Sequence, residues 1–312
     1  MISVIKPGTL TTIQSRPRSN LRHRGVPSGG AADPLSLALA NRLLGNDWDA
    51  PALETTLIGP VLEFDQRCSI AITGGRSDAK LNGININCHA TIDVKPGDSL
   101  SIGVASTGTR SYVAFSGGLD AEVLLGSAST NLQAGFGGHQ GRALSAGDQL
   151  RAGATGSESL ETPADYRLVP SAGVALRTCE SAETHHLSDE SRERLFTENW
   201  QVDQRADRMG IKLDGEKLHV ATDGRMPSAP VFSGTVQCPE HGAPYLLSVD
   251  AGTVGGYPRV AQVARLDRHL VGQLRPGDRV RFARTEPDEA LLALRQKHDY
   301  WRRWLPDINE II

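Results

Sequence analysis

One short pattern occurs three times in this chain and constrains its fold more than any other feature. An apolar residue is followed two positions later by Pro-Gly-Asp or Ala-Gly-Asp, and then by a second apolar residue, at Val94–Leu100, Leu144–Leu150 and Leu274–Val280. Glycine supplies the positive φ of such a turn, and the aspartate can accept hydrogen bonds from nearby backbone amides. After the third copy, Arg279–Phe282 alternates polar and apolar residues, as half-buried strands do. Turns that lead into strands predict repeated barrel or sandwich units.

The rest of the chain also favours strands over helices. Glycine is frequent, 33 of 312 residues, and aromatic residues make up only 5%, which favours turns and close backbone approaches. Further strands are expected at Ser69–Thr73, Thr91–Val94, Ser111–Phe115, Ile211–Leu213, Tyr245–Val249 and Arg259–Val263. Helices are expected from Pro34 with Asp33 as cap, from Ser188, and from Pro287 to about Trp304. We predict a mainly β protein with few helices.

The domain boundaries follow from composition. Residues 151–168 are small, polar and without periodicity, and we interpret them as a linker. The predicted domains are residues 1–155, which include the Gly25–Asn46 loop and helix, and residues 165–285. A C-terminal helix then occupies residues 286–312.

Charge and missing motifs exclude several classes of function. The chain has 33 Lys and Arg against 36 Asp and Glu, for a net charge of −3, so nucleic acid is not an expected partner. It shows neither a signal peptide nor an apolar stretch near the ~18 residues of a membrane span, so we expect a cytoplasmic protein. Four scattered cysteines predict reduced thiols and no metal site. P-loop, nucleophile-elbow, His-Glu-x-x-His and Met-Lys biotin motifs are absent, so another chain would carry ATP or biotin.

Glycine pairs mark the candidate sites. Each pair could be a tight turn, or backbone bare of Cβ atoms whose N–H groups reach an anion or a planar ligand. Ser28, Gly29 and Gly30 precede Asp33 and a helix, an arrangement typical of an anion seat, although Asp33 could simply cap the helix. Glu54 stands in an apolar run and, if buried, needs a cation. Candidates for that cation are Arg24, Arg42 and Arg110, and a structural ion pair explains Glu54 as well as catalysis does.

Two later blocks repeat this combination of glycines and polar residues. Arg110 precedes the pair Gly117–Gly118 on an expected strand. Gln237 is followed by a loop with Asp250, Thr253, Gly255, Gly256 and Tyr257. An Asp, a Thr and a Tyr around a glycine pair can orient an amide or a carboxylate. The Tyr257–Pro258 bond is a candidate cis peptide.

Together these blocks resemble a carboxyltransferase-type family. It includes the C subunit of prokaryotic 5-oxoprolinase, the Kip-type antagonist KipA and the carboxyltransferase region of urea carboxylase, a domain often labelled allophanate hydrolase subunit 2. Gly25–Asn46 matches the pattern Gly-x-Pro-x-Gly-Gly-Ala-Met-Asp…Ala-Asn-x-Leu-x-Gly-Asn, and Ala52–Phe64 matches Ala-Leu-Glu…Gly-Pro-x-Leu-x-Phe. Gly-x-Arg-x-Tyr, Leu-Gly-Ser, Arg-Met-Gly and Thr-x-Gly-Gly-Tyr-Pro follow in the family's order. The match covers about residues 1–285, and the ordered set is highly specific.

The resemblance implies two cyclophilin-like β-barrel domains and work inside a complex with a Kip inhibitor-like B subunit and a LamB-type A subunit. The implied activity is the ATP-dependent opening of 5-oxoproline to glutamate, with ATP used through the complex. Resonance stabilises a lactam amide, so coupling its cleavage to ATP is chemically sensible. A urea carboxylase relative would instead move a carboxyl group between an amide nitrogen and biotin carried by another chain.

The expected site residues fall into two groups. Asp250, Thr253 and Tyr257 are expected to orient the substrate as catalytic groups. The expected substrate-binding residues are Arg24, Ser28, Gly29, Gly30, Asp33, Glu54, Arg110, Gly117, Gly118, Gln237, Gly255 and Gly256. No metal is expected.

Departures from the family pattern leave a second hypothesis open. The family usually has Met where Ala32 stands, Arg where Ala128 stands, and Gln at the positions of Ala243 and Gly252. Losing an arginine and a glutamine removes polar donors from a cleft, which would suit a non-catalytic antagonist that binds a Kip-type inhibitor. Prolyl isomerase activity would rest on analogy of fold alone.

Overall fold

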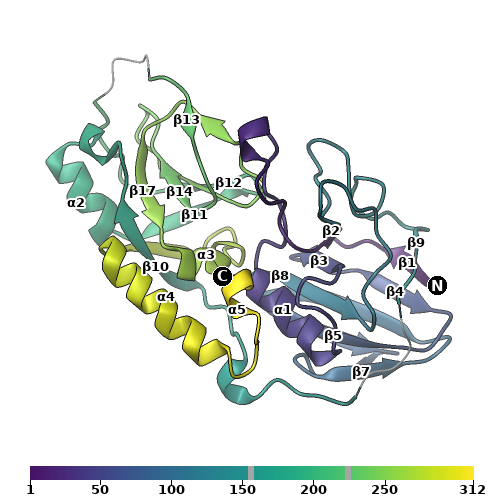
Figure 1. Ribbon diagram of the computed structural model, residues 1–312. Coiled ribbons are helices and arrows are strands. Elements are labelled where there is room, and N and C mark those ends of the chain that lie inside the picture. The colour runs from purple at the N-terminus through teal and green to yellow at the C-terminus, as the bar shows by residue number, and fades with distance from the viewer. Residues whose placement is uncertain (154–157, 222–225) are drawn as a thin grey trace. The chain divides into compact units, whose positions relative to one another are not determined.

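The protein is described by a computed structural model that covers residues 1–153, 158–221 and 226–312. It is mainly β with few helices, as the sequence predicts (Figure 1). The chain divides into two compact units. Unit 1 comprises Met1–Arg18, Gly29–Pro170 and Trp301–Ile311, and unit 2 comprises Ser19–Ser28, Ser171–Tyr300 and Ile312. The sequence-based boundaries followed chain order and did not include this exchange of an N-terminal arm, Ser19–Ser28, and a C-terminal segment, Trp301–Ile311.

Unit 1 is built on one nine-stranded sheet. Six strands follow the order β2-β3-β8-β4-β1-β9, and β5 pairs with β6, β7 and β8. The strands are β1 (Ile2–Lys6), β2 (Leu10–Gln14), β3 (Ala52–Thr56), β4 (Val61–Phe64), β5 (Cys68–Leu81), β6 (Ile84–Asn85), β7 (Thr91–Val94), β8 (Ser99–Phe115) and β9 (Gln149–Leu150). Helix α1 (Pro34–Leu43) packs on β5 and β8, as Figure 1 shows.

Strands β5 and β8 are the long central pair of this sheet. They are antiparallel, with Ile70 opposite Phe115 at one end and Leu81 opposite Leu100 at the other. One face contributes to the main core of unit 1, and the other carries Tyr112 and small residues that pack against α1. Because both faces are covered where the two strands meet α1, Cys68–Gly75 and Thr109–Phe115 are continuously buried rather than alternating.

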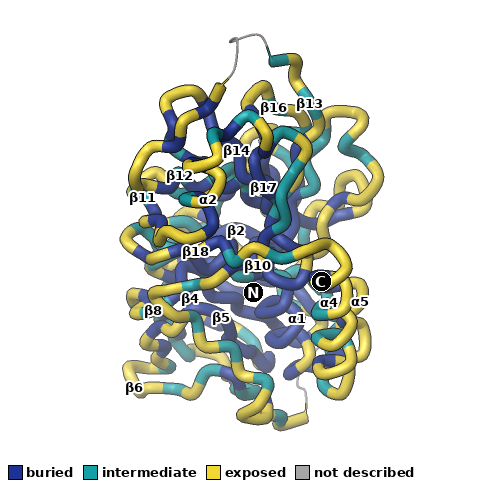
Figure 2. Tube along the Cα trace, turned by 90° about the vertical axis from the view of Figure 1, so that its left-hand side faces the viewer, coloured by how far each residue is buried: buried dark blue, intermediate teal, exposed yellow. Residues whose placement is uncertain are grey.

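Unit 2 is a closed seven-stranded barrel with the strand order β10-β17-β14-β15-β12-β11-β18. Its strands are β10 (Gly173–Glu180), β11 (Trp200–Ala206), β12 (Gly210–Asp214), β14 (Thr235–Gln237), β15 (Tyr245–Leu247), β17 (Arg259–Val263) and β18 (Arg279–Arg284). Trp200, Phe282 and Leu176 are among the residues that fill its core. Figure 2 shows the buried trace along β14 and β17. A separate two-stranded ribbon pairs β13 (Ala229–Pro230) with β16 (Val254–Gly255).

The predicted helices are present, with the caps expected for two of them. Asp33 accepts a hydrogen bond from the Ser36 N–H at 3.1 Å at the start of α1, and Ser188 accepts one from the Ser191 N–H at 3.2 Å at the start of α2 (Asp189–Thr197). The last long helix, α4 (Pro287–Trp301), ends three residues before the predicted Trp304. The remaining helices are η1 (Arg22–Arg24), η2 (Ala164–Tyr166), η3 (Thr184–His186), η4 (Arg265–Asp267), α3 (Arg268–Val271) and α5 (Ile308–Ile311).

All three copies of the recurring turn have the predicted geometry. Their glycines have φ values of 89°, 92° and 90°. In each copy the aspartate accepts a hydrogen bond from the N–H three residues before it, at 2.7, 2.7 and 3.1 Å for Asp98, Asp148 and Asp278. The turns lead into β8, β9 and β18. The prediction of turns that feed strands is therefore confirmed.

The exchanged segments are anchored by specific contacts. In unit 2, the Arg22 guanidinium of the N-terminal arm lies 5.2 Å from the centre of the Phe232 ring and donates hydrogen bonds to the carbonyl oxygens of Val231 and Gly252. In unit 1, Trp304 of the C-terminal segment stacks on Tyr166, with ring centroids 6.2 Å apart and planes inclined by 19°. These contacts explain why segments distant in sequence belong to each unit.

Part of the predicted linker belongs to unit 1. The Leu160 carbonyl oxygen accepts a hydrogen bond from the Thr91 N–H at 2.9 Å, and the Thr162 N–H donates to the carbonyl oxygen of His89 at 2.9 Å. Residues 154–157 of the predicted linker lie outside the described residues. Residues 160–162 are therefore hydrogen-bonded to unit 1 and are not a flexible linker, despite their position in a segment of small polar residues.

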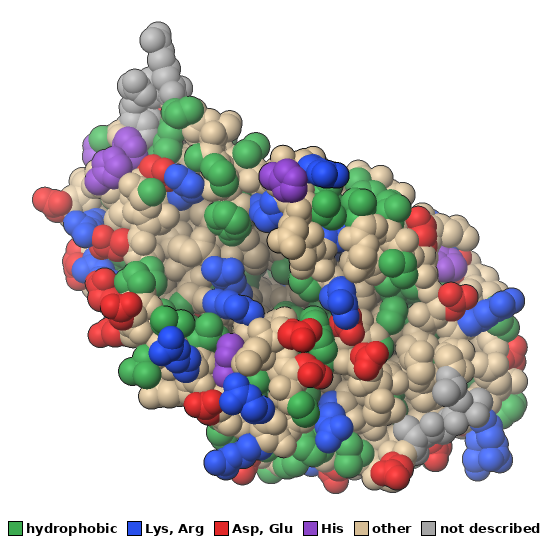
Figure 3. Space-filling view, in the orientation of Figure 1, with side chains coloured by type: hydrophobic (Ala, Val, Ile, Leu, Met, Phe, Trp, Pro, Cys, Tyr) green, Lys and Arg blue, Asp and Glu red, His purple; other side chains and the backbone are tan. Residues whose placement is uncertain are grey.

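The described surface carries no dominant charge. Figure 3 shows basic and acidic side chains interspersed on the face in view, in keeping with the net charge of −3. Among the described residues, no helix combines the length and the apolar character needed to cross a membrane.

Candidate functional site

A cavity of about 420 Å³ opens at one end of the unit 2 barrel. We call it the barrel cavity. Its lining residues are Met226, Pro239, Glu240, His241, Gly256, Tyr257 and Pro258. They come mainly from two loops, the one between β14 and β15 and the one between β16 and β17. Two residues that the sequence singles out, Gly256 and Tyr257, thus line a cavity of small-molecule size.

Hydrogen bonds join the two loops. Gln237, at the end of β14, donates from Nε2 to the carbonyl oxygen of Tyr257 at 3.0 Å, and the Cys238 N–H donates to the carbonyl oxygen of Pro258 at 3.0 Å. A Cβ at Gly255 would lie 2.5 Å from Gln237 Nε2, so this position accepts only glycine without rearrangement. Gln237 and Gly255 therefore support the cavity wall from behind.

Gly256 has a different environment from Gly255. Among the described residues, a Cβ at Gly256 would have Ser228 Oγ, at 3.8 Å, as its one neighbour within 4 Å. Within the described residues, the N–H groups of Gly256 and Tyr257 donate no hydrogen bond to the protein. The Tyr257 side chain is 55% exposed. Two lining residues thus carry backbone donors without a partner among the described residues, and one of them also carries an exposed phenol side chain.

The sequence analysis missed His241, which lines the same cavity. Its Nδ1 accepts a hydrogen bond from the Ala243 N–H at 3.3 Å, and its ring meets Tyr245 edge-on, with centroids 6.1 Å apart. The sequence signal was weak, because a lone histidine in a Pro-x-His-Gly turn matches no motif. Only pairing the β14–β15 loop with the glycine loop reveals it.

Asp250 and Thr253 occupy the same loop as the second glycine pair but do not line the barrel cavity. Asp250 is buried and accepts two hydrogen bonds from the Arg208 guanidinium, at 2.7 and 3.0 Å. The Thr253 carbonyl oxygen accepts from the Val231 N–H at 3.2 Å. Arg22 holds the neighbouring Gly252 carbonyl at 3.1 Å, and burial lowers the pKa of its guanidinium. Asp250 and Thr253 thus hold the loop, and a substrate role for them stays a prediction.

In unit 1, the block around Asp33 forms a closed network of buried groups. Glu54 lies 3.3 Å from Arg110 Nε, and it accepts hydrogen bonds at 2.8 Å from the Ala32 N–H and from the Tyr112 hydroxyl. The Tyr112 hydroxyl in turn accepts from the Asp33 N–H at 2.8 Å. Burial, and after it the nearby Glu54 and Asp33 carboxylates, raise the pKa of Tyr112 well above its usual value. The Ala32 and Asp33 N–H groups at the start of the helix are therefore bound by Glu54 and Tyr112 of the same unit, and anion binding by Ser28, Gly29 and Gly30 stays a prediction.

The structure selects one of the three cations considered for Glu54. Arg110 is 4% exposed and faces the carboxylate. Arg24 is exposed on η1, and the Arg42 guanidinium lies 5.4 Å from the centre of the Trp304 ring. The Glu54–Arg110 pair has the geometry of the structural alternative that the sequence left open.

The other predicted glycines of the N-terminal half shape turns. Gly29 and Gly30 have φ values of 59° and 89°, and a Cβ at Gly30 would lie 2.9 Å from Pro17 N. Gly117 and Gly118 both have φ of 74° at the end of β8, where the Gly117 N–H donates to Asn46 Oδ1 at 2.8 Å. Ser28 ends the arm that belongs to unit 2. Their substrate contacts stay predictions.

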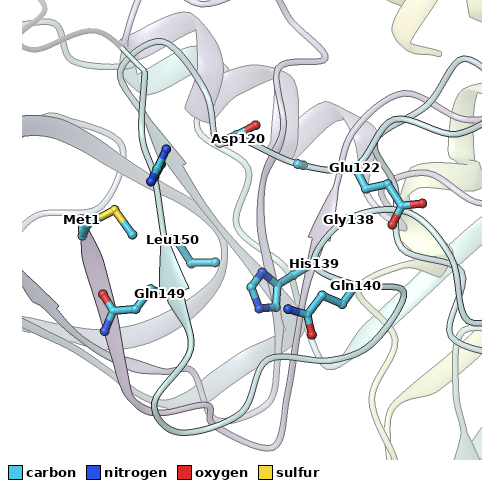
Figure 4. Close-up of a pocket in the computed structure, with 10 residues that line it drawn as sticks. Met1, Asp120, Glu122, Gly138, His139, Gln140, Gln149 and Leu150 are labelled. Carbon is cyan, nitrogen blue, oxygen red and sulfur yellow. The ribbon is translucent and has the colours of Figure 1, made fainter.

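A second cavity, of about 300 Å³, lies within unit 1 (Figure 4). It is lined by Met1, Asp120, Ala121, Glu122, Gly138, His139, Gln140, Gln149, Leu150 and Arg151. His139 lies between Gln140 and Leu150 in Figure 4, and its Nε2 is 3.4 Å from Asp148 Oδ1. None of the predicted site residues lines this cavity.

Two chemical expectations can be compared with the structure. The Tyr257–Pro258 bond is trans, so the prediction of a cis bond is wrong; Gln237 and Cys238 hold this turn without it. All four cysteines are free, and burial raises the pKa of Cys238 to about 12. No group of three or more potential metal ligands occurs in the part of the chain that the structure describes.

The closed barrel, the nine-stranded sheet unit and the loop cavity define a two-unit β protein with a small-molecule-sized opening in its barrel. The chain belongs to the family described as carboxyltransferase domain, subdomain A and B, whose model matches residues 24–284.

Similar proteins fall into two groups. The chain is 34% identical over 303 residues to the 5-oxoprolinase C subunit of Escherichia coli (strain K12), covering 97% of each chain. It is 35% identical over 303 residues to urea amidolyase of Lachancea kluyveri. That alignment covers 89% of this chain but only 16% of the amidolyase. It is also similar to the crystal structure of Kluyveromyces lactis urea carboxylase, with a TM-score of 0.89, 30% identity, and coverage of 95% of this chain and 28% of the other. The amidolyase and carboxylase matches are thus to parts of much longer chains.

Proposed function

We propose that this chain is one component of an ATP-dependent complex that opens 5-oxoproline to glutamate. The observation that carries the proposal is the end-to-end match to the 5-oxoprolinase C subunit, which spans 97% of both chains. The match to urea amidolyase covers only 16% of that longer chain. The oxoprolinase match therefore extends along nearly all of that relative, whereas the amidolyase match covers a small part of its relative.

The barrel cavity offers suitable chemistry for a small lactam. The Gly256 and Tyr257 N–H groups are available donors within the described residues, and Pro239 and Pro258 supply flat apolar walls. Opening a lactam requires stabilisation of negative charge on the carbonyl oxygen, which preorganised donors in a cavity provide. We assign the substrate to this cavity, with Tyr257 and Gly256 as direct contacts and Gln237 and Gly255 as the support behind them.

ATP is assigned to another chain of the complex. A triphosphate needs cationic side chains or a cradle of N–H groups, and the described lining of the barrel cavity contains neither lysine nor arginine and includes the acidic Glu240. We propose a Kip inhibitor-like B subunit and a LamB-type A subunit as partners, with ATP activating the carbonyl oxygen at a site they complete. The proposed location is the cytoplasm.

The proposal is tested by reconstitution. The chain is co-expressed with its two sister subunits, and glutamate release from 5-oxoproline is followed with and without ATP. We expect release only with all three chains and ATP, and loss of most activity in Tyr257→Ala. A complete complex that shows no ATP-dependent glutamate release contradicts the proposal.

A second candidate is a carboxyltransferase component that acts on urea or a related amide with biotin carried elsewhere. The observation in its favour is the TM-score of 0.89 to urea carboxylase across 95% of this chain. Supplying a carboxylated biotin carrier and urea in the same assay separates the two. A tight pair with a Kip-type inhibitor and no turnover of any amide would instead support the antagonist.

A further inference from the structure

We propose that His241 binds the substrate in the barrel cavity, donating a hydrogen bond from its Nε2–H to the carbonyl oxygen of a small amide. The inference rests on the proposed function for the identity of the substrate, but its geometric basis is independent of the sister subunits. It adds a positioned side chain to the backbone donors already described.

The hydrogen bonding of the ring fixes which nitrogen carries the proton. The Ala243 N–H points at His241 Nδ1 at 3.3 Å, and a backbone amide can only donate. Nδ1 must therefore be the acceptor, and the neutral ring carries its proton on Nε2. Nε2 is then a hydrogen-bond donor, which suits a carbonyl oxygen and not an amide N–H.

The turn that carries His241 is rigid. The Gly242 N–H donates to the carbonyl oxygen of Pro239 at 2.9 Å. Gly242 has φ of 82°, and a Cβ there would lie 2.5 Å from the Leu218 carbonyl oxygen. The rings of His241 and Tyr245 form a T-shaped pair with centroids 6.1 Å apart, and the Ala243 N–H holds Nδ1. A donor held in this way gains in the transition state without a reorganisation cost.

The same donor distinguishes amides from esters. Resonance places more negative charge on the carbonyl oxygen of an amide than on that of an ester, so the amide oxygen is the stronger hydrogen-bond acceptor. A lactam is therefore expected to bind His241 better than the lactone with the same ring size.

The kinetic test compares two substitutions in the reconstituted complex. In His241→Gln, the side-chain amide NH₂ can reach the position of Nε2 and still donate, whereas in His241→Asn the amide reaches only the position of Nδ1. We expect kcat/KM for 5-oxoproline to fall on the order of 100-fold in His241→Asn, the usual cost of one such donor, and less than about 10-fold in His241→Gln. His185→Gln, at an exposed histidine outside the cavity, is the control. Equal losses in both His241 variants overturn the donor role.

A binding measurement keeps this inference separable from the proposed function. Nitrogen NMR of the isolated chain reports the protonated ring nitrogen of His241, and 2-pyrrolidinone serves as a lactam probe. We expect the Nε2–H form, and a shift of Nε2 with 2-pyrrolidinone that is weaker with γ-butyrolactone. If the complex lacks oxoprolinase activity but this shift is present, the proposed function fails and the His241 contact stands. A ring protonated on Nδ1, or the absence of any shift, overturns the contact.

Discussion

The glycine pairs Gly29–Gly30 and Gly255–Gly256 look alike in sequence but have opposite surroundings. Beside the first pair, the Ala32 N–H is taken by Glu54, a carboxylate of the same unit. At the second pair, the Gly256 and Tyr257 N–H groups have no acceptor among the described residues, and both residues line a cavity of about 420 Å³. The difference indicates that glycine-rich backbone is a better candidate for ligand binding where the fold leaves its N–H groups without an internal acceptor.

The largest expected effect is on the buried network of unit 1. Glu54→Ala leaves the Arg110 charge and the Tyr112 hydroxyl buried without their carboxylate, so we expect a loss of about 3–5 kcal/mol in the free energy of unfolding. Urea-induced unfolding measures it. Glu63→Ala, at an exposed position on β4, is the control and should change stability by less than about 0.5 kcal/mol. Equal stability losses in Glu54→Ala and Glu63→Ala would contradict a stabilising role for the buried Glu54 network.

Acid should weaken unit 1 through His89. Burial, with a smaller contribution from Arg167, lowers the pKa of His89 from 6.5 to about 4. Because the folded pKa lies below the unfolded value, the unfolded state binds the proton first as the pH falls. Stability is therefore lost between about pH 6.5 and pH 4, by about 3 kcal/mol, and the loss levels off below that window.

The measurement is the free energy of unfolding as a function of pH. His89→Gln should flatten the profile between pH 6.5 and pH 4. His269, buried in unit 2, has its pKa lowered as well. His269→Gln therefore reports how much of the pH dependence of the free energy of unfolding comes from unit 2. An unchanged profile in His89→Gln contradicts the assignment.

The two adjacent glycines of the barrel cavity should respond differently to the same substitution. Gly255→Ala places a Cβ 2.5 Å from Gln237 Nε2 and should cost about 1 kcal/mol of stability. In the part of the chain that the structure describes, the Cβ of Gly256→Ala meets Ser228 Oγ alone, at 3.8 Å, so this substitution should leave stability nearly unchanged but narrow the cavity. Thermal unfolding and the affinity for 5-oxoproline separate the two. A larger stability loss in Gly256→Ala than in Gly255→Ala would show that Gly256, and not Gly255, is the more tightly packed position.

The smallest effect on stability is expected for Tyr257→Phe. The side chain is 55% exposed, so the free energy of unfolding should change by less than about 0.5 kcal/mol. The KM for 5-oxoproline should rise several-fold, because a hydroxyl facing the ligand is lost. Tyr300→Phe, on α4 outside the cavity, is the control. An unchanged KM in Tyr257→Phe would show that the hydroxyl does not contact the substrate.

Local features of the fold were predictable from sequence because their causes are local. The turns ending in Asp98, Asp148 and Asp278 need only a glycine and an aspartate at fixed spacing, and the Asp33 cap needs one side chain next to Pro34. The exchange of the N-terminal arm and the C-terminal segment was not predictable, because it depends on contacts between residues far apart in sequence. Trp304, for example, stacks on Tyr166.

The site was predictable only in part. Gly256 and Tyr257 were found because glycine pairs with polar neighbours suggest ligand-facing backbone. Glu54 was a candidate because a carboxylate in an apolar run needs a cation, and the structure pairs it with Arg110 in the interior. Sequence shows that a carboxylate needs a partner, but it does not show whether that partner is a ligand or the chain itself. His241 carried no local signal, since its role depends on two loops meeting.

The exchanged segments have a consequence for how this protein can be divided. A fragment ending at Pro170 would lack Trp301–Ile311, and one beginning at Ser171 would lack Arg22, which holds the carbonyls of Val231 and Gly252. No single cut of the chain yields two complete halves. We therefore expect neither half to fold fully when produced alone; the family model likewise runs through both units, from residue 24 to residue 284.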